Sequence, residues 1–470
     1  MTTTRSLRCF LAFVLLLFGC GTHNSFFGDG TDGGPDGSNP FFSFDASGDS
    51  GPCVNLACNV QSCGGGHTTV SGTVYDPAGR NPLYNVYVYV PNAAVDPIPT
   101  GAVCAQCQAP ASGSPLPGAA QSDALGHFTV TDVPVGSNIP LVMQIGKFRR
   151  QIIIPQVNAC VDNPIGQPDG MGLETETRLP RTQNEGGNGV DNLPQIAMAT
   201  GACDQLECLM RKIGIADSEF SATGRVHLFQ GMGGSTGPGS TDAYAFWASE
   251  TTLAQHDIVL NSCECSPYER DTEGSAYQAM HDYLSGGGRV FGTHYHYNWF
   301  APPTGPSDFQ TTASWLTGVS LTWPPFYINT TIPKGVALDA WIQNVWQASP
   351  PPSGQIELEY TATDVAEVNA AEATPWIYYG NPSLSGQYNS AYLSFNTPIG
   401  APTTAQCGRA VFSDLHVSSS SGGGATFPTE CVGDPLTTPM TEQESALEFL
   451  FFDLSSCVGD DSQPPPPPPH

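Results

Sequence analysis

The chain has 470 residues, a length that fits two or three domains. Only 12% of the residues are charged, and the formal net charge of −28 reflects a scarcity of Lys and Arg. This charge argues against nucleic acid and anionic lipid headgroups as partners, because both require a cationic protein surface.

The first nineteen residues have the parts of an export signal. Arg5 and Arg8 supply a positive start, and the nine residues 10–18 are all apolar. Nine apolar residues are too few to span a bilayer of about 30 Å as a helix, so residues 1–19 are predicted to be a signal peptide. Residues 17–20, Leu-Phe-Gly-Cys, resemble the bacterial lipobox, although Phe18 stands where a small residue is expected.

The lipobox resemblance implies that Cys20 is lipidated and holds the chain to a lipid bilayer. The alternative is an ordinary secretory signal with a chance cysteine. Gly21 is not the aspartate that retains lipoproteins at the inner membrane of enteric bacteria, which favours an outer-membrane location in the cell envelope. Residues 20–52 are rich in Gly, Asp, Ser and Pro and are predicted to form a flexible stalk.

Fifteen cysteines indicate disulfides formed outside the cytoplasm. Removing Cys9 with the signal and Cys20 by lipidation leaves thirteen, so at least one thiol is free or pairs with a partner. The connectivity stays open. Cys104 and Cys107 form a CxxC, but they lie in a loop of a β region rather than at a helix start. Both are therefore expected to be structural.

Residues 53–160 are predicted to form an all-β sandwich. The segment 69–75 alternates and ends in a turn signal, and in 84–90 the valines fall on one face, as in a strand buried mainly on one side. Further strands are predicted at 126–131 and within 139–154. Residues 70–79 and 122–128 resemble the carboxypeptidase regulatory-like (transthyretin-like) module, which implies a domain that packs, presents or binds and rarely catalyses.

After a predicted linker over 161–199, residues 200–457 alternate between helix and strand. Apolar side chains at helical spacing predict a helix over 204–213, and a capping box at Thr441 to Glu444 opens the last helix. Other predicted elements are strands at 225–229, 258–260, 289–293 and 409–413 and a helix at 276–284. This order implies βαβ units and a mostly parallel, flavodoxin-like sheet.

The predicted fold class is therefore multidomain, with an N-terminal all-β sandwich and a C-terminal α/β domain. Residues 301–400 would be an insertion in the α/β domain, and residues 458–470 a disordered tail with a polyproline run at 464–469.

The α/β half resembles the glutamine-amidotransferase-like fold, and within it the ThuA-like branch. The resemblance lies in residues 257–260, 286–294, 374–376 and 408–412. In amidotransferases of this fold, the nucleophilic cysteine follows the strand that matches residues 290–293. His294 and Tyr295 stand there in this chain, so the resemblance implies no glutaminase activity.

Histidines near the predicted strand ends form the main candidate site. If the strand continues, His294 and His296 point to one face, a spacing suited to zinc, copper, iron or nickel. Asp414 and His416 have the same relation after the last strand, and His227 lies in the first strand. Parallel strands share an edge, so the five residues are predicted to converge, with His294, His296 and His416 as ligands of a possible zinc ion. The alternative is a set of scattered polar residues bonded to backbone or water.

Cys263 and Cys265 follow a neighbouring strand at the same edge. A reactive Cys263 beside a histidine is one interpretation, and disulfide pairing is the favoured one.

The sequence is compatible with three functions. The first is a lipid-anchored binding protein that takes a small polar ligand or carbohydrate at the mouth of its α/β domain, where exposed aromatic side chains of the 299–379 region could stack on sugar rings. The alternative is a metal-dependent enzyme that uses the histidine cluster at the same edge. The third is a structural envelope protein with a degenerate α/β domain.

Overall fold

The computed structural model describes residues 53–107, 109–166, 176–266, 274–316, 325–359, 361–379, 389–417 and 424–466. The predicted signal peptide, the lipidation site Cys20, the stalk as far as residue 52 and the last proline residues of the tail lie outside the described residues. The described residues all belong to one compact unit. No helix in the described ranges is long and apolar enough to cross a membrane.

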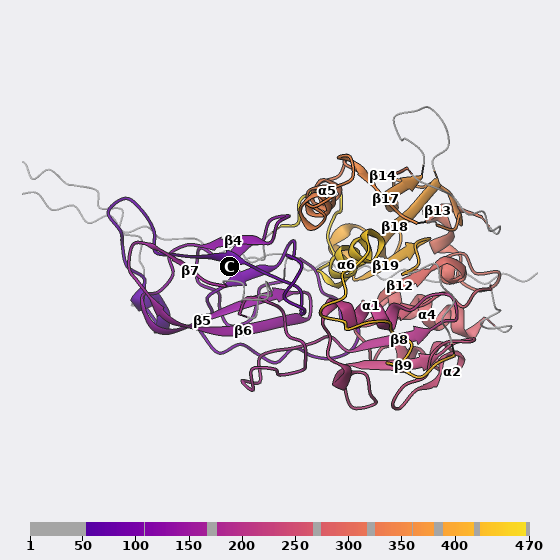
Figure 1. Ribbon diagram of the computed structural model, residues 1–470, viewed down its shortest axis with the longest axis horizontal. Coiled ribbons are helices and arrows are strands. Elements are labelled where there is room, and N and C mark those ends of the chain that lie inside the picture. Colours follow the sequence, from indigo (N-terminus) through magenta and orange to yellow (C-terminus); the bar gives the residue numbers. More distant parts are fainter. Residues whose placement is uncertain are drawn as a thin grey trace, which may run out of the picture. The chain divides into compact units, whose positions relative to one another are not determined.

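The N-terminal part is an all-β sandwich, as predicted (Figure 1). One sheet has the strand order β4-β1-β7 and the other has the order β3-β2-β5-β6. Side chains from both sheets meet in one core, among them Val70, Phe128 and Leu141. The elements are η1 (Asn55–Asn59), β1 (Thr69–Thr73), β2 (Tyr87–Tyr89), β3 (Ala120–Gln121), β4 (His127–Val130), β5 (Gly136–Ile145), β6 (Phe148–Val157) and β7 (Asp162–Pro164).

Two sequence expectations for this sandwich were wrong. The single strand within 139–154 is a hairpin, β5 and β6, which turns at Gly146 with φ of 53°. Strand β2 is buried on both faces, because Tyr87 and Tyr89 pack with Val142 in a second small cluster. Tyr89 also donates a hydrogen bond to the backbone of the loop that covers it, at Ser112 O (2.9 Å).

The C-terminal part is built on a mixed sheet with the order β10-β9-β8-β11-β12-β19-β18-β17-β14-β15. Strands β10 to β19 in this order are parallel, and the last four pair antiparallel. In chain order, β9-β8-β11-β12-β19 reads 2-1-3-4-5, the flavodoxin-like arrangement. The mostly parallel sheet is therefore confirmed.

The strands are β8 (Ile196–Thr200), β9 (Val226–Gln230), β10 (Thr241–Asp242), β11 (Ile258–Asn261), β12 (Arg289–Thr293), β13 (Ala313–Trp315), β14 (Phe326–Ile328), β15 (Gln355–Ile356), β16 (Val365–Val368), β17 (Ala373–Tyr379), β18 (Asn389–Thr397) and β19 (Gly408–Ser413). The helices are α1 (Leu206–Ile213), α2 (Ala243–Trp247), α3 (Glu250–Leu253), α4 (Ser275–Ser285), α5 (Pro333–Val345) and α6 (Glu442–Ser455), with 3-10 turns η2 (Asp217–Glu219), η3 (His294–Trp299), η4 (Asp308–Thr312) and η5 (Thr403–Ala405).

Both faces of the parallel strands are covered, which explains their continuous apolar runs. Leu260 of β11 belongs to a core shared with α1 and α6, whereas the adjacent Val259 belongs to a core shared with α2, α3 and α4. Figure 1 shows α1 and α6 in front of the stacked strands. Helix α6 begins at the predicted capping box, with Thr441 as the N-cap and Glu444 as its reciprocal partner.

The first of these cores also contains the interior of the β-sandwich, so the two predicted domains share one hydrophobic interior. Phe148 of β6 packs against Phe451 and Phe452 of α6, with ring centroids 5.9 and 5.4 Å apart. The segment 161–199, for which a linker is predicted, contains β7 of the sandwich and all but the last residue of β8. The segment that joins the two sheets is therefore shorter than predicted.

Residues 458–470 are predicted to be disordered, and this prediction is wrong for the first residues of the segment. Asp461 is buried, because it pairs with Arg409 and Lys334 (2.7 Å each). Val458 is also buried and forms a bridge with Gln106. These contacts hold the chain against the body of the protein well past the end of α6.

Disulfides join distant parts of the described chain and account for twelve of the thirteen cysteines left after the signal and Cys20. Cys104 and Cys107 pair with Cys407 and Cys457, so both are structural, as expected. The other pairs are Cys53–Cys58, Cys63–Cys160, Cys203–Cys265 and Cys208–Cys431. Cys263 is free and buried, so the disulfide favoured for it was wrong, and the prediction of a leftover thiol is confirmed.

Candidate metal centre

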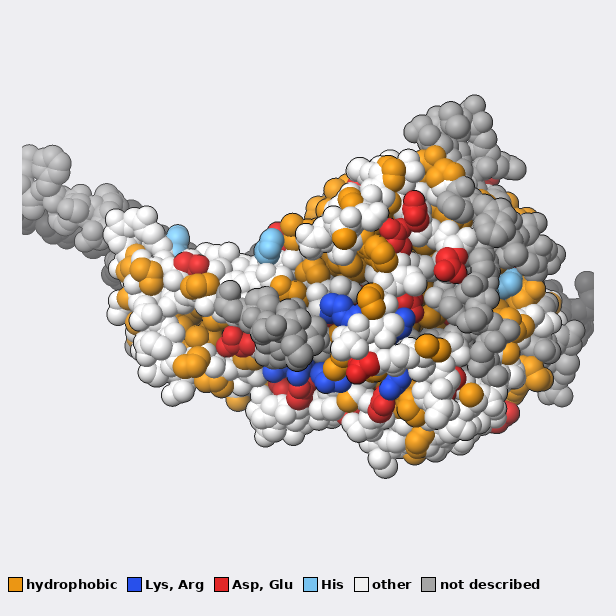
Figure 2. Space-filling model, in the orientation of Figure 1, with side chains coloured by type: hydrophobic (Ala, Val, Ile, Leu, Met, Phe, Trp, Pro, Cys, Tyr) orange, Lys and Arg blue, Asp and Glu red, His pale blue; other side chains and the backbone are white. Residues whose placement is uncertain are grey.

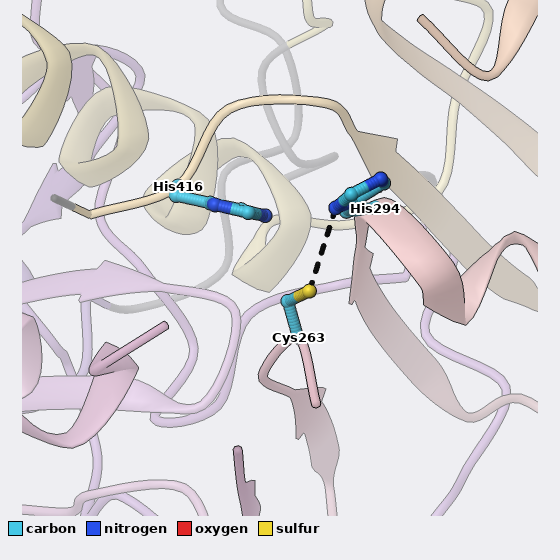
Figure 3. Close-up of side chains that lie close together, drawn as sticks. All are labelled: Cys263, His294 and His416. Carbon is cyan, nitrogen blue, oxygen red and sulfur yellow. Dashed lines mark hydrogen bonds between the residues drawn. The ribbon is translucent and has the colours of Figure 1, made fainter. Parts of the chain in front are cut away.

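A cluster of metal-ligating side chains lies at the carboxyl edge of the parallel strands. Cys263 follows the end of β11, His294 directly follows β12, and His416 follows β19 (Figure 3). One ligating atom from each of the three lies within 4.8 Å of the other two. β8 and β11 are neighbours at the point where the strand order reverses, and open α/β sheets bind ligands at the carboxyl edge near this point.

The cluster is compact and largely shielded from solvent. Cys263 Sγ lies 3.5 Å from His294 Nδ1, and the His294 and His416 rings have centroids 5.2 Å apart. Cys263 is fully buried and His294 is 6% exposed. In Figure 3 the end of the His416 ring points toward the space between the other two side chains.

A sharp turn in the chain places His294 in the cluster. Strand β12 ends at Thr293, and His294 has φ of 47°, in the left-handed region that residues other than glycine seldom adopt. The chain then enters the 3-10 turn η3. Such backbone strain occurs mostly at functional sites, where the surrounding structure holds it.

The same turn removes His296 from the cluster, contrary to the sequence expectation. Because the strand does not continue past Thr293, His294 and His296 do not share a strand face. His296 Nδ1 accepts a hydrogen bond from Trp299 Nε1 (3.0 Å), and its Nε2 lies 2.8 Å from Ser262 O. Both ring nitrogens of His296 are therefore engaged by the protein.

His227 is also outside the cluster. It is the second residue of β9, close to the amino end of the strand, whereas the cluster lies beyond the carboxyl ends. His227 Nδ1 lies 3.0 Å from His256 Nε2, and His227 Nε2 lies 3.2 Å from Gln195 Nε2. The expectation that all five residues converge was thus wrong for His227. A residue near the start of a parallel strand lies at the opposite edge of the sheet from the residues that follow the strand ends.

Asp414 lies next to the cluster and pairs with a second carboxyl group, Asp364. Asp414 Oδ2 accepts a hydrogen bond from the backbone N–H of Asp364 (3.1 Å), and Asp364 Oδ2 lies 3.6 Å from His294 Nε2. Burial raises the pKa of Asp364 to about 6, and burial together with the charge of Asp364 raises the pKa of Asp414 further. Each of the two buried carboxyl groups therefore ionises less readily than an isolated aspartate.

Asp204 is a further acidic residue beside the cluster that sequence reasoning missed. It follows β8 at the same edge, and its Oδ1 accepts a hydrogen bond from Val417 N (2.8 Å). Its charge raises the pKa of His416, while burial, the larger effect, lowers it. Its place after β8 was the signal that could have identified it. Asp364 gave no such signal, because it lies in the predicted insertion.

The ligating groups are neutral in the metal-free protein. Burial raises the pKa of the Cys263 thiol to about 12, and burial and the neighbouring His416 lower the pKa of His294 to about 3. Several buried polar atoms here make no hydrogen bond to any described residue: His294 Nε2, His416 Nε2, both carboxyl oxygens of Asp364, Asp204 Oδ2 and Asp414 Oδ1. Buried polar groups are normally satisfied, so this concentration points to a bound group.

The separation of Cys263 and His294 suits a tetrahedral metal ion. With Zn–S near 2.3 Å and Zn–N near 2.05 Å, a tetrahedral angle places the sulfur and nitrogen about 3.6 Å apart. The observed separation of Cys263 Sγ and His294 Nδ1 is 3.5 Å. Thiolate and imidazole are ligands that zinc shares with copper, iron and nickel.

Comparisons with known proteins give only distant similarity. No family model matches the chain, and no curated protein is similar to it. Among solved structures, a ThuA-like protein from Bacteroides uniformis is 10% identical, with 55% of this chain and 88% of that chain covered and a TM-score of 0.30.

Two carbohydrate-active enzymes are also similar at this distance. The carbohydrate deacetylase Agd3 is 10% identical (47% of this chain, 28% of that chain, TM-score 0.25). The GH42 β-galactosidase Gan42B is 9% identical (50% of this chain, 29% of that chain, TM-score 0.23). The chain thus spans less than a third of either enzyme.

Proposed function

We propose that this protein is a metal-dependent enzyme, with zinc or a similar transition-metal ion held by Cys263, His294 and His416. The observation that carries the proposal is the convergence of one sulfur and two imidazole nitrogens within 4.8 Å at the carboxyl edge of the sheet. Three protein ligands leave one tetrahedral position for water or substrate, which is the arrangement of catalytic zinc sites. Zinc at such a position lowers the pKa of its bound water and polarises carbonyl groups.

A carboxyl group lies beside one of the ligands. Metal-bound histidines usually donate their second ring N–H to a carboxylate, which fixes the tautomer and the ring orientation. Asp364, 3.6 Å from His294 Nε2, would do this for His294 while Nδ1 binds the metal. The negative charge of Asp204 acts on His416 and raises its pKa.

A thiol nucleophile activated by His294 is less well supported by the same contacts. Catalytic cysteines need a lowered thiol pKa and partial exposure. Cys263 is fully buried, and its pKa is raised to about 12. A metal ion would deprotonate this thiol outright, whereas the neutral His294 would leave it protonated.

Cobalt substitution tests both parts of the proposal. The full chain loaded with Co²⁺ is expected to show the intense visible bands of a tetrahedral ion and a thiolate-to-cobalt charge-transfer band. Cys263→Ser should lose the charge-transfer band, and His416→Ala should lose the tetrahedral bands. His227→Ala is the matched control and should leave the spectrum unchanged, because His227 lies outside the cluster.

Azide added to the cobalt protein then tests for an open coordination position. A shift of the visible bands supports a site that can accept water or substrate. Bands that azide leaves unchanged would mean a closed, structural metal site and would contradict the enzymatic part. A spectrum that Cys263→Ser leaves unchanged would contradict the whole assignment.

The substrate is proposed to be a small polar molecule, and carbohydrates are one class of such molecules. The ThuA-like resemblance of the sequence is compatible with this class. Stacking of a sugar on the aromatic side chains of the 299–379 region has less support, because Trp299, Phe300 and Trp376 are buried in the core. The carboxypeptidase regulatory-like identity of the sandwich stays a prediction of the sequence.

We also propose that the chain is exported and anchored by lipid on Cys20 at the cell envelope, in the outer membrane. The signal-like start supports this, and so do the disulfides, which form in oxidising compartments. In cells fed an alkyne fatty acid, the label should become attached to the protein that begins at Cys20, and Cys20→Ala should abolish the labelling. Equal labelling of the variant would contradict the anchor.

A further inference from the structure

A cavity of about 360 Å³ lies at the opposite, amino-terminal edge of the parallel strands. Its lining comes from four places: the β2 and β5–β6 region of the sandwich, the loop 96–112, the amino ends of β11 and β12, and the end of α6. The cavity is of the size that takes a small organic molecule. It is separate from the cluster of Cys263, His294 and His416, none of which lines it.

The walls of this cavity are held in place covalently. Cys104 and Cys107, in the loop, are bonded to Cys407 before β19 and to Cys457 after α6. The loop also approaches the backbone closely at Gly287, where φ is 113° and an added Cβ would lie 2.6 Å from the carbonyl carbon of Val103. A cavity with fixed walls is preformed, which lowers the entropic cost of binding a ligand.

The cavity is a concentration of positive charge in an acidic protein. It is lined by three of the chain's 15 Lys and Arg residues, Lys147, Arg149 and Arg289, but by only two of its 43 Asp and Glu residues, Asp96 and Asp257. Figure 2 shows one face of the molecule, on which uncharged groups cover most of the surface and the few Lys and Arg side chains gather near the junction of β6 and α1.

One of the three cations already has a carboxylate partner. Lys147 Nζ pairs with Asp257 (2.5 Å) and donates to Gly101 O (2.7 Å). Arg149 donates to Val190 O (3.0 Å) and to the backbone oxygen of Asp96 (2.9 Å), and it forms no ion pair with a described residue.

Arg289, like Arg149, has no carboxylate partner among the described residues. Its guanidinium donates only to backbone oxygens: Cys407 O (2.8 Å), Ser456 O (3.3 Å), Ala105 O (3.5 Å) and Gly287 O (3.5 Å). It is 6% exposed, and burial and the nearby Arg409 lower its pKa to about 10. A buried charge without a counter-charge is costly, and a bound anion would remove that cost.

The remaining lining is mainly apolar. It includes Ile98, Val103, Ala111, Ile145 and Ile258. From the apolar walls and these two guanidinium groups without a carboxylate partner, we propose that this cavity is a second binding site, for a small organic carboxylate with an apolar body. Its carboxylate pairs with Arg289, which is the more exposed of the two arginines. This site does not depend on the proposed metal centre, since the two lie at opposite edges of the sheet.

A pair of probes that differ only in charge tests the proposal. 2-Naphthoate and its neutral counterpart 2-naphthamide are titrated into the full chain in a calorimeter. Naphthoate is expected to bind at one site per chain and about tenfold more tightly than naphthamide, because only the anion can pair with Arg289. Arg289→Gln should remove the difference, and Arg225→Gln, which changes a cation that does not line the cavity, should keep it.

A cavity-filling variant covers the case in which Arg289→Gln does not fold. Ala111→Trp places a bulky ring in the cavity without removing Arg289, and both probes should bind more weakly to it. Three results would each overturn the proposal: equal affinities for the two probes, no binding of either, or binding that Ala111→Trp leaves unchanged. Loss of metal binding in Cys263→Ser bears on the other site alone, so the two proposals fail separately.

Discussion

Zinc binding near neutral pH is expected to release one proton per ion, and Cys263→Ala is expected to release none. The reason lies in the charge states of the ligands. Burial holds the pKa of the Cys263 thiol at about 12 and the pKa of His294 at about 3, so at pH 7 only the thiol carries a proton that the metal must displace. Burial also lowers the pKa of His416.

The sign of the pH dependence follows from the same states. The metal binds the thiolate, and the thiol is protonated at every pH below about 12, so zinc affinity should rise about tenfold for each pH unit between 6 and 8. Cys263→Ala should lose this slope and bind zinc more than about 100-fold more weakly, a larger effect than losing an outer partner of a ligand. Calorimetry in buffers of different ionisation enthalpy measures the proton count. A count of zero for the unaltered chain would contradict Cys263 as a ligand.

Arg409→Ala is expected to lower the free energy of unfolding by about 3–5 kcal/mol. Arg409 is fully buried and pairs with Asp453 and Asp461 (2.7 Å each), while Lys334 contacts the same two carboxylates. Removing the guanidinium leaves two buried carboxylates with one cation. The loss of unfolding free energy should be large because removing one partner leaves a buried charge without its counter-charge. This cost arises even where the intact pair itself contributes little net stability.

A double-mutant cycle separates this cause from simple loss of packing. Asp461→Asn removes one of the stranded charges, so Arg409→Ala should cost less in that background than in the unaltered chain. Urea unfolding of the four proteins gives the coupling free energy. Arg225→Ala, which removes a cation with no ion pair in the described part of the chain, is the control. Equal costs in the two backgrounds, or a loss under about 1 kcal/mol, would contradict the network.

Local patterns predicted many of the helices and strands, but not β8, the short helices α2 and α3 or any element between β12 and β19. The apolar stripe of α1, the capping box of α6 and the apolar runs of β11, β12 and β19 appear where the sequence placed them. These signals depend on a few consecutive residues and on burial of both sheet faces, so no distant partner is needed to recognise them. The hairpin of β5 and β6 was missed because its turn takes only two residues, Gly146 and Lys147.

The candidate site was predictable only in part, since it depends on contacts between distant segments. His294 and His416 were identified from their places after strands. His296 was misassigned because the sequence does not show that the strand ends in a left-handed turn at His294. Cys263 came out free because Cys265 pairs with Cys203, 62 residues away, a choice that spacing does not determine.

The zinc content of the full chain tests the central claim most directly. Protein purified without chelator, then supplied with zinc and dialysed, should hold one zinc per chain by elemental mass spectrometry. Cys263→Ser and His416→Ala should hold far less, and His227→Ala should hold as much as the unaltered chain. A chain that holds no zinc or similar transition-metal ion after loading, or equal zinc in all four proteins, would contradict a metal centre at Cys263, His294 and His416.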